Sequence, residues 1–386
     1  NVLLLGRGGG GHSAPDLTDT MILASIDPVN YTESLISIPR DLWVTVPNKG
    51  AMKINAAWET GEFQYLGKVA PGSTNPQAIQ AGFDEVDQVV NDVTGVDIDY
   101  NVLVNFQAFR QAVDTVGGVT VNVPTDLVDP TMAWENNDNP LLATAGIDNF
   151  DGAQALRYVR SRETTSDFAR SQRQRALLLA LKAKVATLGT LSNPLKISQL
   201  MTTFGNNVET DLSLNDASRL YGIVKNISDD QTKSIGLTDE PNKLITTGNM
   251  SGQSIDLPTA GLFNYTAIQD YLRTQLVDGY ILKEKAPVVI LNGTLQVGLA
   301  TTLEQQLISY GYNVVRIGDA PTNNYGHTYL IDRSHGANKY TGHYLSEHLD
   351  TPLTTSLPDT RIQANGAAFV IIIGSDETLT ASTAAN

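Results

Sequence analysis

Arginines recur at short intervals between residues 157 and 175, in a chain whose formal net charge is −15. A guanidinium group can hold two phosphate oxygens at once, whereas a lysine ammonium acts as a point charge. A cationic stretch on an acidic background indicates one focused anion and not a polyanion spread across the surface. We therefore predict an anion-binding site in this stretch.

Residues 166 to about 188 have the apolar spacing of a long helix. Arg170 falls on the face that carries leucines further along, and Arg173 and Gln174 lie on the flanks of that face. A buried guanidinium is costly unless it is paired and hydrogen-bonded. Asp167 can pair with one of the two arginines and cap the helix, but it cannot satisfy both. An external anion at this helix N-terminus is the predicted partner.

Residues 158–162 are interpreted as the end of a strand, in which alternate side chains share a face. Arg160 and Arg162 then project together toward the anion. Arg157 lies off their face and is not assigned to the site.

The same arginines could instead form a surface salt-bridge network with acids such as Glu163 and Asp167. The residues alone leave both interpretations open. Arg175 is not assigned to the anion site, because at helical spacing it points away from Arg170.

Three upstream residues are candidates to join the site. Arg40 follows the predicted strand 34–38, and α/β proteins place their ligands at strand ends. Lys53 lies between apolar neighbours. Asp19 precedes the predicted strand 20–26, where a carboxylate could hold Mg²⁺ together with substrate phosphates and water. For each residue, a solvated loop or turn position is the alternative.

Composition excludes several classes of protein. The acidic balance argues against nucleic acid as a partner, and the absence of cysteine excludes zinc ribbons and thiol catalysis. No stretch reaches the roughly 20 consecutive apolar residues that span a bilayer. Because the chain begins at Asn1 and enters a strand at once, we expect an N-terminal segment to be missing, so that absent signals carry no information.

Strand-like and helix-like segments interleave, which predicts an α/β layered fold. A charged segment ending in proline, 283–287, is interpreted as a linker between a first domain of residues 1–282 and a second, smaller α/β domain of residues 288–377. Residues 378–386 are expected to form a frayed tail. In the first domain we predict strands at 2–5, 20–26, 34–38, 100–104 and 119–123, and helices at 76–93, from 106, at 166–188, 214–227 and 265–276.

Six short motifs, in order, resemble the LytR–CpsA–Psr family of cell-wall glycopolymer transferases. The resemblance covers about residues 1–280, and the second domain resembles the LytR C-terminal domain. The motifs are Leu17-Thr18-Asp19-Thr20, Ser37-Ile38-Pro39-Arg40-Asp41, Lys53-Ile54-Asn55-Ala56-Ala57, Val113-Asp114 with Gly117-Gly118-Val119, Tyr158-Val159-Arg160-Ser161-Arg162, and Asp167-Phe168-Ala169-Arg170 with Arg173-Gln174.

The resemblance implies a mixed central sheet flanked by helices, with an apolar tunnel for a polyprenyl tail. It also implies transfer of a glycopolymer from a polyprenyl-pyrophosphate carrier to peptidoglycan. The enzyme would work on the outer face of the cytoplasmic membrane, anchored by an N-terminal transmembrane helix that this sequence lacks. Residues 79–104 and the leucines 177–188 are candidates to line the tunnel, although ordinary core packing explains any one of them.

Carried over motif by motif, the pyrophosphate ligands are Arg40, Lys53, Arg160, Arg162, Arg170, Arg173 and Gln174. Asp19 would hold Mg²⁺ or Mn²⁺, and Asp41 or another carboxylate would take the proton of the acceptor hydroxyl. The sequence departs from the family at one point, because residues 6–11 lack the second aspartate of a Gly-x-Asp pattern. Asp16 could replace that aspartate, or the metal could rest on Asp19 alone.

Other functions fit parts of the sequence. A hydrolase of the carrier pyrophosphate, or a module that only binds the lipid, would use the same arginines. Residues 6–11 also satisfy the G-x-G-x-x-G spacing of dinucleotide-binding proteins, but a loop and a strand follow where that motif needs a helix. The four histidines of the second domain, His327, His335, His343 and His348, fit no metal motif and are interpreted as surface residues.

Overall fold

The computed structural model describes residues 1–10, 14–68, 73–162, 167–188, 204–239, 243–250, 252–364 and 366–376. The chain divides into two compact units, residues 1–269 and residues 270–386. The boundary falls within helix α8 (Thr266–Gln275). The two units are described in turn.

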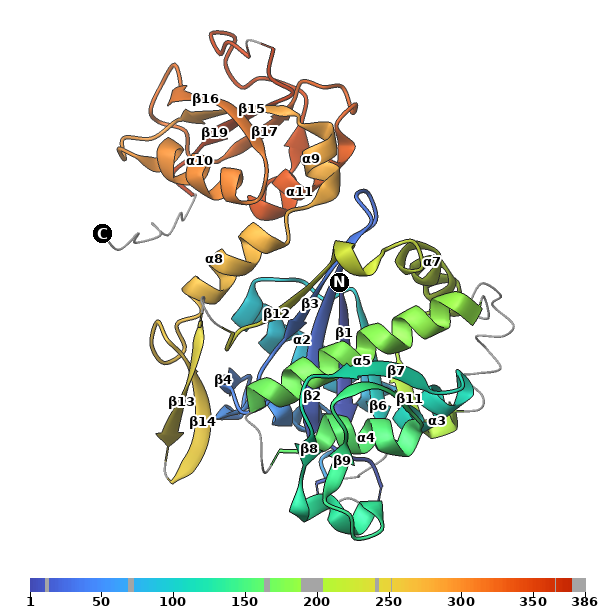
Figure 1. The fold of residues 1–386 in the computed structure, drawn as a ribbon. Helices are drawn as coiled ribbons and strands as arrows, with labels where there is room; N and C mark the ends of the chain where they lie inside the picture. The colour runs from blue at the N-terminus through green and yellow to red at the C-terminus, as the bar shows by residue number, and fades with distance from the viewer. Residues whose placement is uncertain are drawn as a thin grey trace. The chain divides into compact units, whose positions relative to one another are not determined.

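A mixed sheet of six strands forms the centre of the first unit, in the order β11-β6-β1-β2-β3-β12 (Figure 1). Strand β2 is antiparallel to both β1 and β3, whereas β6 and β12 run parallel to β1 and β3 respectively. The strands are β1 (Val2–Arg7), β2 (Thr18–Asp27), β3 (Thr32–Ser37), β6 (Tyr100–Asn105), β11 (Val208–Thr210) and β12 (Thr232–Gly236).

Both faces of this sheet are covered by helices. Figure 1 shows α5 (Asp167–Leu188) crossing one face and α2 (Pro76–Thr94) behind the other. Because successive side chains of a strand point to opposite faces, the strands read as nearly continuous apolar runs. The core under α5 contains Val2, Ile22, Ala24 and Leu35, with Leu178 and Leu179 of α5 packed against them. The predicted mixed sheet flanked by helices is confirmed.

Local sequence signals explain where helix α2 begins and ends, and this helix matches its prediction most closely. Asn75 caps its first turn by accepting hydrogen bonds from two backbone amides, and Pro76 occupies the first helical position. Gly95 ends the helix in the left-handed conformation. Phe83, Val86 and Val90, at helical spacing, are buried.

Residues 119–160 form a lobe in which the sequence predicted only strand 119–123 and a strand end at 158–162. It is built from β7 (Val119–Val123) paired with β10 (Gly146–Phe150), β8 (Leu127–Val128) paired with β9 (Leu141–Ala143), and the 3-10 helix η2 (Pro130–Asn136). These elements pack on helices α3 (Phe106–Thr115) and α4 (Gly152–Arg160) around a core that includes Phe150 and Tyr158. The lobe is therefore an ordered part of the first unit.

The first unit has further described strands and helices outside the central sheet and the lobe. Two hairpins, β4 (Trp43–Val46) with β5 (Gly50–Lys53) and β13 (Ile245–Met250) with β14 (Gln253–Pro258), were not predicted. The other helical elements are η1 (Ile54–Ala56), α1 (Ala57–Leu66), η4 (Gly205–Asn207), α7 (Leu214–Val224) and η5 (Asp229–Gln231).

The second unit contains a five-stranded sheet in the order β16-β15-β19-β17-β18. Strand β19 is buried along its whole length, and the predicted small α/β domain is confirmed. Its strands are β15 (Pro287–Asn292), β16 (Asn313–Asp319), β17 (Tyr329–Asp332), β18 (Leu353–Thr354) and β19 (Phe369–Ile373). Its helices are α9 (Gly279–Glu284), α10 (Leu299–Ser309) and α11 (Lys339–His348).

Two local predictions are wrong. Residues 283–287 are not a linker, because they contain the end of α9 and the start of β15. Residues 158–160 are not a strand, because they form the last turn of α4, which an Asp151–Gln154 capping box starts. The predicted tail, 378–386, lies outside the described residues.

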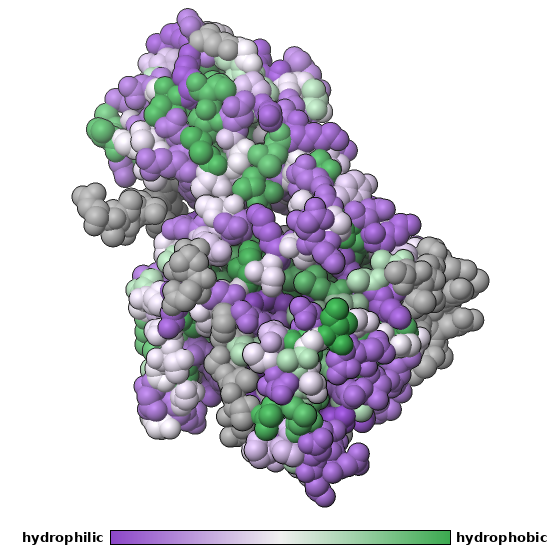
Figure 2. Space-filling model, viewed as in Figure 1, coloured by the Kyte–Doolittle hydropathy of each residue, from purple (hydrophilic) through white to green (hydrophobic). Residues whose placement is uncertain are grey.

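The face of the molecule shown in Figure 2 is mainly hydrophilic, with hydrophobic residues distributed singly or in small groups. In the part of the chain that the structure describes, no helix combines the length and the apolar character needed to cross a membrane.

Close packing of α1 against α2 gives a test of this fold. A Cβ atom on Gly61 would lie 2.3 Å from the carbonyl oxygen of Ala81, so Gly61→Ala must separate the two helices. We expect a loss of about 1–3 kcal/mol in the free energy of unfolding, measured by chemical denaturation. Gly222→Ala in α7 is the matched control, because a Cβ there meets nothing within 4 Å. It should leave stability unchanged or raise it; equal losses in both variants would contradict this packing.

Candidate functional site

The candidate site lies along one edge of the central sheet. Strands β1, β3 and β6 end there at Arg7, Ser37 and Asn105, and β2 begins there at Thr18. The loops after these strands therefore converge, and they carry the upstream motifs together to one place.

Asp19 and Arg40 form the first contact of the site. A guanidinium nitrogen of Arg40 donates to Asp19 Oδ1 at 2.6 Å, and Asn55 Nδ2 donates to the same oxygen at 3.3 Å. The Asp19 side chain is partly exposed, and its Oδ2 accepts no hydrogen bond within the described residues. The predicted proximity of Asp19 and Arg40 is thus present, although they are 21 residues apart.

Asp41 and Lys53 extend this cluster. Lys53 Nζ donates to Asp41 Oδ1 at 2.7 Å, and Arg40 Nε lies 3.4 Å from Asp41 Oδ2. Burial alone would raise the pKa of Asp41, but the hydrogen bond from Lys53 and the charges of Arg40, Lys53 and Arg162 lower it overall. The charge of Arg162 therefore acts on the Asp41 carboxylate together with the charges of Arg40 and Lys53.

Helix α5, which crosses one face of the sheet, places side chains at the same edge. Gln174 Nε2 donates to Thr20 Oγ1 of β2 at 2.9 Å. Arg170 lies one turn earlier on α5 and is buried, with 6% of its surface exposed, as its helical position predicted. The Asp167 side chain and Glu163, predicted as ion-pair partners, lie outside the described residues.

Arg160 lies at the end of α4 and has its own partner. Its guanidinium contacts both carboxylate oxygens of Glu135 at 2.9–3.0 Å and stacks over the ring of Phe106, which follows β6. Arg157, three residues earlier on the helix, donates to the Glu135 carbonyl oxygen at 3.1 Å. Arg157 and Arg160 therefore share a face, which corrects the strand-based prediction.

Arg173 holds the backbone that carries Arg160 and Arg162. It donates to the carbonyl oxygens of Tyr158 at 2.9 Å and Ser161 at 2.5 Å. Asp129 accepts hydrogen bonds from Ser161 Oγ and from the Arg162 amide on the other side of this turn. We assign Arg173 a positioning role, whereas the sequence predicted a direct contact with the anion.

Arg175 points into the protein and not to the anion site. It is buried between α5 and the sheet, where it donates to Ser37 Oγ at 2.7 Å and to Ser234 Oγ at 2.5 Å and pairs with Asp239. These bonds fix α5 to β3 and β12.

A buried ion cluster lies at the end of β1, around Arg7. Arg7 pairs with Asp16 at 2.9 Å and Glu209 at 2.6 Å, and its guanidinium stacks over Trp58. Asp16 is buried and its Oδ1 accepts a hydrogen bond from Arg7. Glu62 is buried in the same region, and burial followed by the charge of Asp16 raises its pKa to about 7.

The sequence analysis missed Asn55, Asp129 and Glu135. Asn55 lay inside a quoted motif, so its amide could have been considered as a partner of Asp19. Asp129 and Glu135 lie in a segment for which no helix or strand was predicted. The Asp-Pro-Thr sequence that starts η2 at Asp129 was a usable capping signal.

Dinucleotide binding is disfavoured by the topology. The next strand after β1 in the described residues, β2, pairs with it antiparallel, whereas the dinucleotide fingerprint needs parallel strands joined by a helix.

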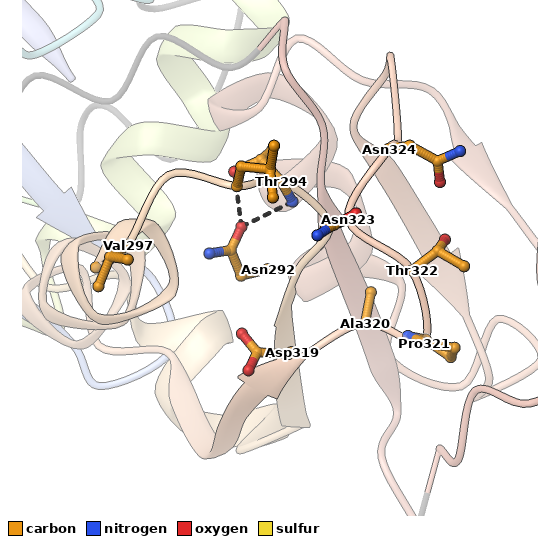
Figure 3. Close-up of a pocket in the computed structure, with 11 residues that line it drawn as sticks. Asn292, Thr294, Val297, Asp319, Ala320, Pro321, Thr322, Asn323 and Asn324 are labelled. Carbon is orange, nitrogen blue, oxygen red and sulfur yellow. Dashed lines mark hydrogen bonds between the residues drawn. The ribbon is translucent and has the colours of Figure 1, made fainter.

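The second unit has a pocket of about 760 Å³ at the carboxyl ends of β15 and β16. Figure 3 shows Asn292 and Asp319 where these strands end, with Thr294 donating to Asn292. The four histidines of this unit are exposed, as predicted. Among the described residues, no group of three or more His, Asp or Glu side chains is arranged to hold a metal ion.

Comparison with known proteins adds to this geometry. The model of the LytR_cpsA_psr family matches residues 1–261, and the model described as LytR cell envelope-related transcriptional attenuator matches residues 285–376. A structure of TagT bound to LIIa-WTA superposes with a TM-score of 0.52 at 27% identity, covering 70% of this chain and 86% of that one.

Curated relatives are enzymes or proteins of the cell wall. The chain is 33% identical over 227 residues to the polyisoprenyl-teichoic acid–peptidoglycan teichoic acid transferase TagU of Oceanobacillus iheyensis, which covers 57% of this chain and 61% of TagU. It is 26% identical over 332 residues to the cell wall biosynthesis protein LcpA of Corynebacterium glutamicum, which covers 80% of this chain and 61% of LcpA. The matched region thus spans about three-fifths of these relatives.

The raised pKa of Glu62 predicts a pH-dependent stability. Between its ordinary pKa near 4.5 and about 7, Glu62 keeps its proton in the folded state only, so this stabilisation is lost as pH rises through 7. Glu62→Gln, which resembles the protonated acid, should raise the melting temperature at pH 8 and change it little at pH 4.5. Glu304→Gln in the second unit is the control. An equal effect of Glu62→Gln at both pH values would contradict the assignment.

Proposed function

This chain belongs to the LytR–CpsA–Psr family, and from that membership we propose that it transfers a glycopolymer from a polyprenyl-pyrophosphate carrier to peptidoglycan. The observation that carries the proposal is the sheet edge where Arg40 and Lys53 contact Asp41 and the charge of Arg162 also acts on this carboxylate. The names of the relatives, which include teichoic acid transferases acting on peptidoglycan, support the same reaction.

The proposed reaction is a phosphoryl-group transfer. The acceptor hydroxyl oxygen attacks the phosphorus that bears the glycan, and the bond from that phosphorus to the bridging oxygen breaks. Polyprenyl phosphate leaves, and a phosphodiester joins the glycan to peptidoglycan. Negative charge grows on the bridging oxygen as the bond breaks, so fixed guanidinium groups stabilise the transition state more than the ground state.

Arg40, Arg160, Arg162 and Arg170 are the proposed pyrophosphate ligands, with Lys53 and Gln174 beside them. Two of them now bind carboxylates of the protein itself, Arg40 with Asp19 and Arg160 with Glu135. A bound pyrophosphate would share or replace these contacts. The pairing keeps the guanidinium groups oriented before the substrate arrives, which lowers the cost of binding it.

Asp41 is the best-placed carboxylate for the proton of the acceptor hydroxyl. Its lowered pKa keeps it ionised at neutral pH, so it can accept a hydrogen bond from the hydroxyl. The same cations make it a weak base. We propose that Asp41 orients the hydroxyl and receives its proton late, as the phosphorus–oxygen bond forms.

We propose that Asp19 holds Mg²⁺ or Mn²⁺. Its Oδ2 has no hydrogen-bond donor among the described residues and the side chain is partly exposed, which suits a cation that takes one or two carboxylates and otherwise phosphates and water. When bound, the metal would neutralise charge on the diphosphate. Asp19 would bind the metal through Oδ2, while Oδ1 keeps its hydrogen bond from Arg40.

The carrier substrate implies a place of action at a membrane. We propose that the enzyme works on the outer face of the cytoplasmic membrane and is held there by a transmembrane helix that precedes Asn1. The apolar tail of the carrier would lie between the sheet and its helices. Leu177, one of the predicted tunnel residues, instead packs in the core of the 119–160 lobe.

Arg162→Ala tests the anion site. Because charge-assisted hydrogen bonds contribute about 1.5–3 kcal/mol, we expect affinity for a short-chain polyprenyl pyrophosphate to fall by about tenfold or more, measured by calorimetry. The Arg162 side chain is exposed, so the melting temperature should not change. Arg219→Ala, with a side chain that is 83% exposed on α7, is the control. Unchanged lipid affinity in Arg162→Ala would contradict the site.

An assay with lipid-linked oligosaccharide, Mg²⁺ and peptidoglycan fragments separates the possible activities. Transfer gives a joined glycan–peptidoglycan product. Free glycan phosphate without that product would identify a hydrolase, and lipid binding without turnover would identify a binding module.

Asp19→Asn tests the metal proposal without relying on activity. In the native protein, Mn²⁺ should bind when polyprenyl pyrophosphate is present and should give a changed electron paramagnetic resonance spectrum. Asp19→Asn keeps the size of the side chain but removes its charge, so bound Mn²⁺ should fall by about tenfold. Equal Mn²⁺ binding in both proteins would remove Asp19 as a ligand.

A further inference from the structure

The lobe beside the arginines carries an exposed indole that the proposed reaction does not use. Trp134 lies in η2 with 73% of its surface exposed, although tryptophan is usually well buried. It directly precedes Glu135, whose carboxylate holds Arg160. Trp134 is therefore the sequence neighbour of a residue that holds one of the proposed pyrophosphate ligands.

Hydrogen bonds to the end of α4 fix the segment that carries Trp134. Asp129 caps η2 and also binds Ser161, next to the end of α4. At the other end, Arg157 and Arg160 both bind Glu135. The indole is thus displayed on a short helix that is tied to the arginine-bearing helix at both ends.

Residues with amide and carboxylate side chains follow Trp134 in the chain. The sequence continues from Trp134 as Glu-Asn-Asn-Asp-Asn, and Asn136 and Asn139 use their side chains to hold the loop backbone. Asn137 and Asp138 are exposed, both in the left-handed conformation, and their side chains make no hydrogen bond within the described residues. An apolar ring beside free hydrogen-bonding groups is a surface that suits a ligand with apolar faces and hydroxyl edges.

The charge of the segment around Trp134 indicates which class of ligand this surface can bind. Residues 124–151 contain six acids and no lysine or arginine. Three of these acids, Asp126, Asp138 and Asp151, are exposed, and their charge disfavours anionic lipid headgroups and phosphate-rich polymers. A sugar ring fits better, because its carbon–hydrogen face can stack on the indole and its hydroxyls can donate to carboxylate and amide oxygens.

We propose that Trp134 and the loop 135–139 form a binding platform for an uncharged sugar ring of the glycan substrate. This inference rests on the proposed function for the identity of the glycan. A sugar linked to a pyrophosphate held by Arg160 would extend across the neighbouring surface. The sugar could belong to the lipid-linked donor or to the peptidoglycan acceptor, and the experiment distinguishes the two.

Trp134→Ala should separate sugar binding from pyrophosphate binding. If the sugar is that of the donor, affinity for a polyprenyl-pyrophosphate disaccharide falls about five- to tenfold, while affinity for the sugar-free carrier does not change. If it is that of the acceptor, the KM for peptidoglycan fragments rises by a similar factor at constant kcat. Trp134→Phe should restore most of the loss, since it keeps an aromatic face.

Ile147→Ala is the matched control, because Ile147 is 81% exposed on β10 in the same lobe. It should change neither measurement. Unchanged values in both arms for Trp134→Ala, or an equal loss for the sugar-free carrier, would overturn the proposal.

Tryptophan fluorescence gives a readout that does not need turnover. Trp58 is fully buried and Trp43 is half-buried, so Trp134 dominates quenching by acrylamide. A tetrasaccharide of N-acetylglucosamine and N-acetylmuramic acid, or the lipid-linked disaccharide, should protect it, and Trp134→Phe should abolish the protected signal. Protection without transfer would refute the transferase while leaving the platform intact; transfer without protection by either ligand would refute the platform alone.

Discussion

Guanidinium groups that lie in or beside the core must each find an acceptor, and this constraint organises the first unit. Arg7, Arg40 and Arg160 contact carboxylates from distant segments, as the pairs with Glu209, Asp19 and Glu135 show. A buried charge that lost its partner would destabilise the protein by several kcal/mol. These contacts therefore decide which loops lie beside which strand ends, and the arginines are already oriented when an anion arrives.

The fold was predictable where local signals agreed with tertiary packing. Helix α2 has an asparagine cap, a first-turn proline, an apolar stripe and a final glycine, and its limits were predicted within a residue. Helix α1 was missed because it buries Gly61 and Glu62 along with Trp58, which leaves no apolar stripe to detect. The last turn of helix α4 was predicted as a strand end because Arg160 and Arg162 alternate, although the Asp151–Gln154 capping box marked a helix start.

The candidate site was predictable from motif order but not from local chemistry. Asp19, Arg40 and Lys53 converge because β1, β2 and β3 place their loops at one sheet edge, and the motifs fixed these positions in the chain. Asp129 and Glu135 were missed because their partners, Ser161 and Arg160, lie 32 and 25 residues away and no periodic pattern links them. The roles of these residues in binding and catalysis remain predictions.

The bonds from Arg173 to the carbonyl oxygens of Tyr158 and Ser161 have an electrostatic consequence for any anion at this edge. The carboxyl end of a helix carries a partial negative charge of about half an elementary charge, so α4 would repel a phosphate near Arg160 and Arg162. Arg173 places a full positive charge on those carbonyls and reverses the sign of the local field. An arginine that need not touch the substrate thus lets a helix end that disfavours anions support an anion-binding surface.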